Sequence, residues 1–67
     1  MKAVLKVAGI KSSTDVRNVQ SAISICEGVV ASEISSNKKE ITIIFNNNYI
    51  TLENIIDNIE KFGYIVI

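Results

Sequence analysis

The sequence predicts a two-layer α+β domain whose elements follow the order strand, helix, strand, strand, helix, strand. Three observations lead to this prediction. Apolar side chains recur at every second position, at 3, 5 and 7 and again at 41, 43 and 45, as in half-buried strands. Apolar residues recur every three or four positions in residues 16–26 and 52–62, as in amphipathic helices. Glycines at positions 9, 28 and 63 separate these segments.

In the first half, we expect the strand to turn its odd-numbered side chains, Ala3, Leu5 and Val7, toward the core. Three consecutive residues, 12–14, could cap the helix that follows, and Ser12 with Asp15 has the spacing of a capping box. The buried face of that helix is predicted to comprise Val16, Val19, Ala22, Ile23 and Cys26.

In the second half, residues 29–35 form a weaker strand with Ile34 as its clearest inward residue, and residues 36–39 form a turn. Residues 41–45 are the strongest strand, and asparagines 46–48 form a loop. Thr51 caps the second helix, and residues 64–67 close the domain as a strand. The predicted buried face of this helix comprises Leu52, Ile55, Ile56, Ile59 and Phe62.

Right-handed crossovers would place both helices on one face of a single antiparallel sheet. The expected strand order is 4-1-3-2, which defines the ferredoxin-like βαββαβ sandwich. The 67 residues are enough for one domain, residues 1–67. Thirteen isoleucines supply much of its core.

Composition excludes several classes of function. Seven basic and seven acidic residues give no net charge, and no basic cluster suited to nucleic acid is present. The single cysteine excludes an internal disulfide, and without histidine the chain offers no obvious catalytic base, so we expect no enzyme. No apolar run is long enough to span a membrane, and we expect a cytoplasmic location.

Several short motifs share the spacing of one known family. They are Gly9, Val19, Ala22-Ile23, Gly28-Val29 and Gly63-Tyr64. In this spacing the whole chain resembles the heavy-metal-associated domain, which occurs as small copper chaperones and at the N-termini of metal-transporting P-type ATPases. The family has a Gly-Met-x-Cys-x-x-Cys loop before its first helix.

The chain departs from the family at the positions that bind metal. Ile10 stands at the methionine, Ser12 at the first cysteine and Asp15 at the second. In the family, the thiolates of these two cysteines hold Cu(I) or Zn(II). A serine hydroxyl stays protonated near neutral pH, and a carboxylate is a hard donor better suited to Mg²⁺ or Ca²⁺. We therefore expect a degenerate loop, Gly9 to Asp15, with no metal or other cofactor.

Two functions follow from this comparison. The first is a protein-interaction module that has lost its soft-metal site, whose partner would be another protein, a metal-transporting ATPase or a second copy of the chain. The alternative is a residual role in metal homeostasis through a weak site or one shared with a partner.

Other residues near the loop have simpler interpretations. Cys26 is expected to be a buried apolar residue, and Tyr64 a core residue. Lys11, Ser12, Ser13 and Thr14 could bind an anion at the helix start, although Asp15 would already occupy part of that positive end. Helix capping is the favoured interpretation of these hydroxyls.

The helix-free face of the predicted sheet carries four aliphatic residues: Val4, Ile44, Ile65 and Ile67. The expected strand order places Ile65, Val4 and Ile44 side by side, edged by Lys2, Lys6 and Thr42. Because contiguous exposed apolar groups often mark contact surfaces, we expect self-association or partner binding here.

Overall fold

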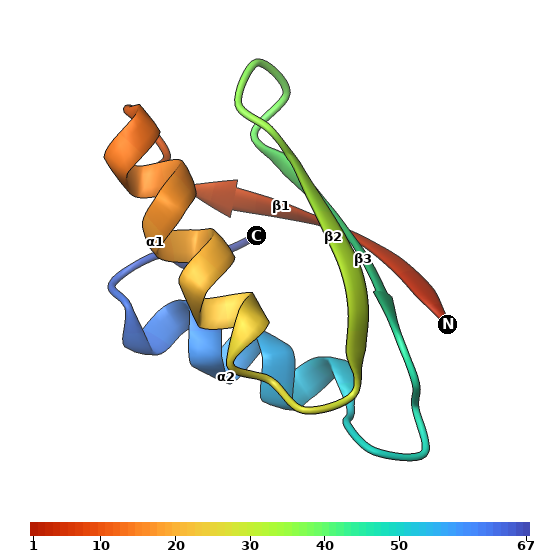
Figure 1. The fold of residues 1–67 in the computed structure, drawn as a ribbon. Helices are drawn as coiled ribbons and strands as arrows, with labels where there is room; N and C mark the ends of the chain where they lie inside the picture. The colour runs from red at the N-terminus through yellow and green to blue at the C-terminus, as the bar shows by residue number, and fades with distance from the viewer.

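The computed structural model describes all residues, 1–67, and contains the six predicted elements in the predicted order. The strands are β1 (Lys2–Ala8), β2 (Val29–Ser35), β3 (Glu40–Phe45) and β4 (Ile65–Val66). The helices are α1 (Ser13–Ser24) and α2 (Leu52–Lys61). Both helices lie on the same side of the sheet (Figure 1).

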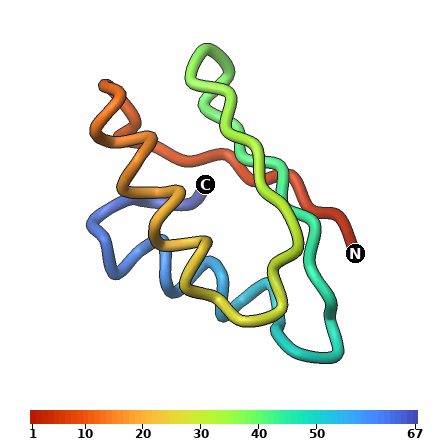
Figure 2. Tube along the Cα trace, viewed as in Figure 1, coloured from red at the N-terminus to blue at the C-terminus, as the bar shows by residue number.

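The four strands form one antiparallel sheet in the order β2-β3-β1-β4. This is the predicted order 4-1-3-2 read from the other edge, so the ferredoxin-like fold is confirmed. The turn between β2 and β3 and the loop before α1 lie at the same end of the molecule (Figure 2). The loop between α1 and β2 lies at the other end.

A core of fourteen buried residues fills the space between the sheet and the helices. Seven are isoleucines, and burial of each contributes about 1.5–3 kcal/mol. Strand β3 shows the alternation most clearly, since Ile41, Ile43 and Phe45 are buried whereas Ile44 is exposed. The core comprises Leu5, Val7, Ile10, Val19, Ala22, Ile23, Cys26, Ile41, Ile43, Phe45, Ile50, Ile55, Ile59 and Tyr64.

Both helices begin at the residues that the sequence favours. Ser12 is the N-cap of α1, and both hydrogen bonds of its capping box with Asp15 are present. Thr51 is the N-cap of α2, and its hydroxyl accepts a hydrogen bond from the Asn54 N–H at 3.2 Å. These bonds satisfy backbone donors that the first helical turn leaves unpaired.

Three details differ from the sequence prediction. Phe62 is 44% exposed, because the chain leaves the helical conformation at this C-cap residue and α2 buries only Ile55 and Ile59 completely. Strand β4 is two residues long, shorter than the predicted 64–67. Ile50, which the sequence assigned to no element, is buried just before α2.

The neighbouring residues Ile43 and Ile44 test this assignment of faces. Ile43→Val should lower the free energy of unfolding by about 1 kcal/mol, because it removes a fully buried methyl group. Ile44→Val removes the same group from the exposed face and should change it by less than about 0.5 kcal/mol. Urea denaturation followed by circular dichroism measures both, and equal losses would contradict the assignment.

Candidate functional site

Residues 9–15 form the loop that joins β1 to α1. Gly9 adopts φ of +98°, a conformation that L side chains rarely adopt, so the turn requires glycine. The next residue, Ile10, is buried in the core. Ile10, which the sequence predicts to stand at the family methionine position, thus anchors the loop to the core.

The carboxylate of Asp15 organises the loop through its Oδ2 atom. This oxygen accepts hydrogen bonds from the backbone N–H of Lys11 at 2.9 Å and from that of Ser12 at 3.2 Å. The Ser12 hydroxyl lies 3.3 Å from the same oxygen and also 3.3 Å from the Asp15 N–H, from which it accepts. Ser12 and Asp15 are therefore brought together, as their spacing predicts.

Tyr64 ties this loop to the other end of the chain. Its hydroxyl donates a hydrogen bond of 2.7 Å to Asp15 Oδ1 and accepts one of 3.2 Å from Asn18 Nδ2. Tyr64 is buried, as expected of a core residue. Its polar contact with Asp15 was not predicted, because the two residues are 49 positions apart and no local pattern relates them.

These contacts shift the acidity of both groups. The pKa of Asp15 is lowered from 3.8, mainly by the hydrogen bond from Tyr64 and then by that from the Lys11 N–H, while desolvation opposes the shift. The pKa of Tyr64 is raised from 10.0, mainly because its proton is held by Asp15. The folded loop therefore favours an ionised Asp15 beside a protonated Tyr64.

The donor set does not fit a soft metal ion. The two positions predicted to match the family cysteines, Ser12 and Asp15, provide one hydroxyl and one carboxylate, and both carboxylate oxygens already accept hydrogen bonds from the chain. No group of three or more histidine, cysteine, aspartate or glutamate side chains is placed to hold a metal. Such ions prefer thiolate or imidazole ligands, which the loop does not supply.

Cys26 lies past the opposite end of α1, a helix of twelve residues and about 18 Å. The thiol is buried, as expected. It donates to the carbonyl oxygen of Ala22 at 3.4 Å and accepts from Asn58 Nδ2 at 2.9 Å. Cys26 therefore cannot complete a metal site in the loop of the same chain.

The candidate anion-binding residues Lys11, Ser12, Ser13 and Thr14 all lie exposed at the start of α1. Two of their backbone N–H groups, those of Lys11 and Ser12, already donate to Asp15. The helix start therefore holds an anion that belongs to the protein itself.

All four aliphatic residues expected on the helix-free face are exposed, but their arrangement differs from the predicted row. Ile65 pairs with Ala8, four residues along β1 from Val4, or about 13 Å. The expectation that Ile65 and Val4 lie side by side is therefore wrong, because β4 pairs only with the end of β1.

Ile67, rather than Ile65, lies near Val4. Its N–H donates to the Lys6 carbonyl oxygen at 2.8 Å, and it continues the antiparallel register as the partner of Lys6. Ile67 is then a diagonal neighbour of Val4, and Val4 is a diagonal neighbour of Ile44, which pairs with Lys2. Diagonal neighbours on one face lie about 7–8 Å apart. The four residues thus form a diagonal apolar band across the sheet.

Comparisons with known proteins agree with the geometry of the fold. A metallochaperone, CopZ, superimposes with a TM-score of 0.96, at 21% identity and over 100% of both chains. The chain has the heavy-metal-associated fold. A copper-binding domain from a P-type ATPase gives a TM-score of 0.94 at 21% identity, with coverage of 98% of this chain and 89% of that one. Oxidized MerP from Ralstonia metallidurans gives 0.94 at 21% identity, with coverage of 100% and 93%.

The resemblance predicted from the spacing of motifs is confirmed at the level of the fold. No protein-family model and no curated protein matches the sequence. No helix has the length and apolar character needed to cross a bilayer, and the cytoplasmic location stays a prediction.

The role of Asp15 can be tested through the pH dependence of stability. A carboxyl whose pKa is lowered on folding stabilises the protein above its ordinary pKa of 3.8, and that contribution is lost as the pH falls through the lower folded value. Asp15→Asn should therefore lower the urea midpoint near neutral pH and weaken its decline in acid. Tyr64→Phe keeps the carboxylate without the Tyr64 donor and should give an intermediate result. Parallel pH curves for wild type and Asp15→Asn would contradict the assignment.

Proposed function

We propose that this chain is a non-enzymatic protein-interaction module that keeps the heavy-metal-associated fold but has no soft-metal site. The observation that carries the proposal is the state of Asp15, at the second ligand position. Its carboxylate accepts hydrogen bonds from the Lys11 and Ser12 N–H groups and from the Tyr64 hydroxyl. A metal ion would have to displace these donors and would gain only hard oxygen ligands.

The residues also support the proposal that the module is not an enzyme. The chain has no histidine, and its one thiol is buried between Ala22 and Asn58. General acid–base catalysis needs a titratable group within hydrogen-bond reach of a bound substrate. The one ionisable pair in the loop, Asp15 and Tyr64, is engaged internally and supports the fold.

Restoring the ligands tests the proposal directly. The wild-type protein should not compete with bicinchoninate for Cu(I), whereas Ser12→Cys with Asp15→Cys should compete, because two thiolates then stand at the family positions. Ser12→Ala with Asp15→Ala removes the same groups without adding thiols and is the matched control. Competition by the wild type would favour the alternative, a residual metal role. A folded double-cysteine variant that does not compete would show that the loop is misplaced.

The partner proposed for this module is another protein: a metal-transporting ATPase or a second copy of the chain. The diagonal band supports a protein contact on the helix-free face. Its members are Val4, Ile44, Ile65 and Ile67, which are exposed and adjoin one another. Contiguous exposed apolar residues mark interaction surfaces more often than scattered ones do. The zero net charge of the chain leaves little electrostatic repulsion between copies.

Sedimentation equilibrium tests self-association through this band. Wild type should show a mass that rises with concentration, and Ile44→Lys should remain monomeric because it places a charge in the band. Gln20→Lys, at an exposed site on α1 and therefore away from the helix-free face, introduces the same charge as the control and should behave as wild type. A monomeric mass for the wild type at all concentrations would remove the second copy as a partner.

A further inference from the structure

A second exposed apolar surface lies at the end of the molecule away from the loop of residues 9–15. It combines Ile25 from the connection after α1, Val30 from β2 and Tyr49 from the connection before α2, which are 66%, 73% and 75% exposed. Tyr49 borders two open hollows, one shared with Ile25 and the other with Val30. The three residues therefore form one continuous surface, which we call the Tyr49 surface.

The backbone beneath Tyr49 is held in place by the neighbouring loop. The Asn46 N–H donates to the Gly28 carbonyl oxygen at 2.8 Å, and the Tyr49 N–H donates to the Asn46 carbonyl oxygen at 3.0 Å. A Cβ at Gly28 would lie only 2.9 Å from the Tyr49 Cβ. The loop before β2 and the loop before α2 therefore approach so closely that only glycine fits at position 28. Tyr49 is thus an exposed aromatic side chain on a backbone that hydrogen bonds hold in place. Tyrosine is enriched among the hot-spot residues of protein interfaces.

The charges around the Tyr49 surface are mainly acidic. The hollow between Ile25 and Tyr49 is lined by Glu27 and Asp57 and by one cation, Lys61. Two further carboxylates, Glu53 and Glu60, lie four and three residues from Asp57 on α2. These positions are neighbours on a helix surface.

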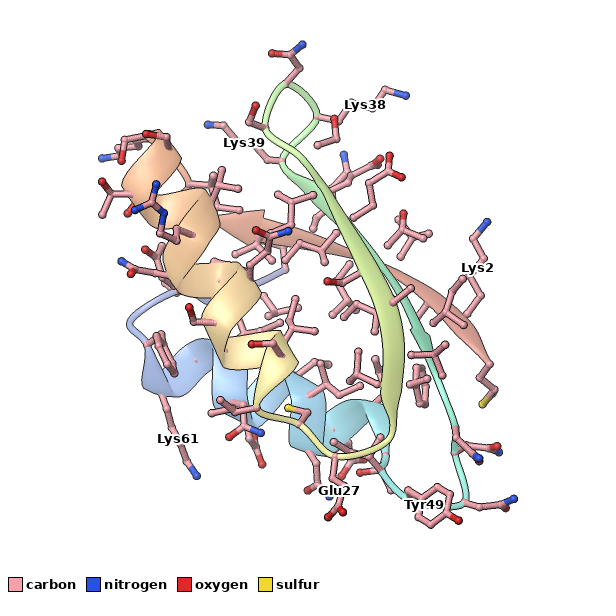
Figure 3. All side chains as sticks on the ribbon, viewed as in Figure 1. Lys2, Glu27, Lys38, Lys39, Tyr49 and Lys61 are labelled. Carbon is pink, nitrogen blue, oxygen red and sulfur yellow. The ribbon has the colours of Figure 1, made fainter.

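The basic residues of the β2–β3 turn lie elsewhere. Figure 3 shows Glu27 and Tyr49 together at one end of the molecule and Lys38 and Lys39 at the other. Charge complementarity therefore selects a cationic partner for the Tyr49 surface rather than an acidic one.

We propose that the Tyr49 surface docks a basic segment of another protein, in which apolar side chains alternate with lysine or arginine. The apolar side chains would contact Tyr49, Ile25 and Val30. The cationic groups would face Glu27 and Asp57. None of these residues belongs to the 9–15 loop or to the diagonal band, so this proposal goes beyond the function proposed above.

An NMR titration with a defined peptide tests the proposal. The probe is acetyl-Lys-Leu-Lys-Lys-Leu-Lys-amide, and acetyl-Glu-Leu-Glu-Glu-Leu-Glu-amide is the control of opposite charge. The lysine peptide should cause saturable shifts in residues 25–30 and 46–50, and the glutamate peptide should not. Tyr49→Ser should weaken the affinity about tenfold or more, the effect of losing a hot-spot residue. Asn37→Ser, at an exposed site in the β2–β3 turn at the opposite end of the molecule, should leave the affinity unchanged.

Three results would overturn the proposal: no saturable shifts with the lysine peptide, equal shifts with both peptides, or unchanged affinity in Tyr49→Ser. Shifts at the same residues on dilution of the protein alone would assign the surface to a second copy and would also overturn it. None of the residues involved belongs to the 9–15 loop, so failure here is distinguishable from failure of the Cu(I) competition.

Discussion

The Asp15 carboxylate is the constraint on which the candidate site depends. One oxygen gathers the backbone donors at the start of α1, and the other receives the Tyr64 hydroxyl that precedes β4. A single anion therefore caps the helix, shapes the loop and joins the two halves of the chain. The N-terminal end of a helix favours negative charge, so the position stabilises the ionised carboxylate that performs these roles.

Most of the core lies outside this loop, which contributes only Ile10 to it. Burial of aliphatic side chains holds the two layers together, and the fully buried Ile41, Ile43, Ile55 and Ile59 lie outside residues 9–15. This separation explains how a chain with 21% identity to a metallochaperone can share its fold over 100% of both chains. A shared fold does not by itself transfer a function, and the function proposed here therefore rests on the loop.

Most of the fold could be predicted from the sequence because its signals are local. The alternation of Ile41, Ile43 and Phe45 determines which face of β3 is buried, and the spacing of Ser12 and Asp15 determines where α1 begins. The features that could not be predicted depend on which residues of β1 and β4 pair with one another. The short β4 places Ile67 rather than Ile65 near Val4, and an alternating pattern contains no information about where pairing stops.

The candidate site follows the same distinction. The sequence paired Ser12 with Asp15 correctly as a capping box, since they lie within one helical turn, and their place at the ligand positions of the family stays a prediction. It did not predict that Tyr64 and Asn18 would contact this pair, because contacts between distant segments exist only after the layers pack. The Tyr49 surface was missed for the same reason, since Ile25 and Tyr49 come from two separate connections and Val30 from β2.

A two-dimensional NMR titration of labelled protein with Cu(I), and then with Zn(II), under reducing conditions tests the central claim most directly. If Asp15 holds the loop through its own hydrogen bonds, the amide resonances of Lys11 and Ser12 should keep their positions throughout, in a spectrum that remains folded. Saturable shifts confined to residues 9–15 would contradict the account, because they would show that a metal ion displaces the chain's own donors from that carboxylate.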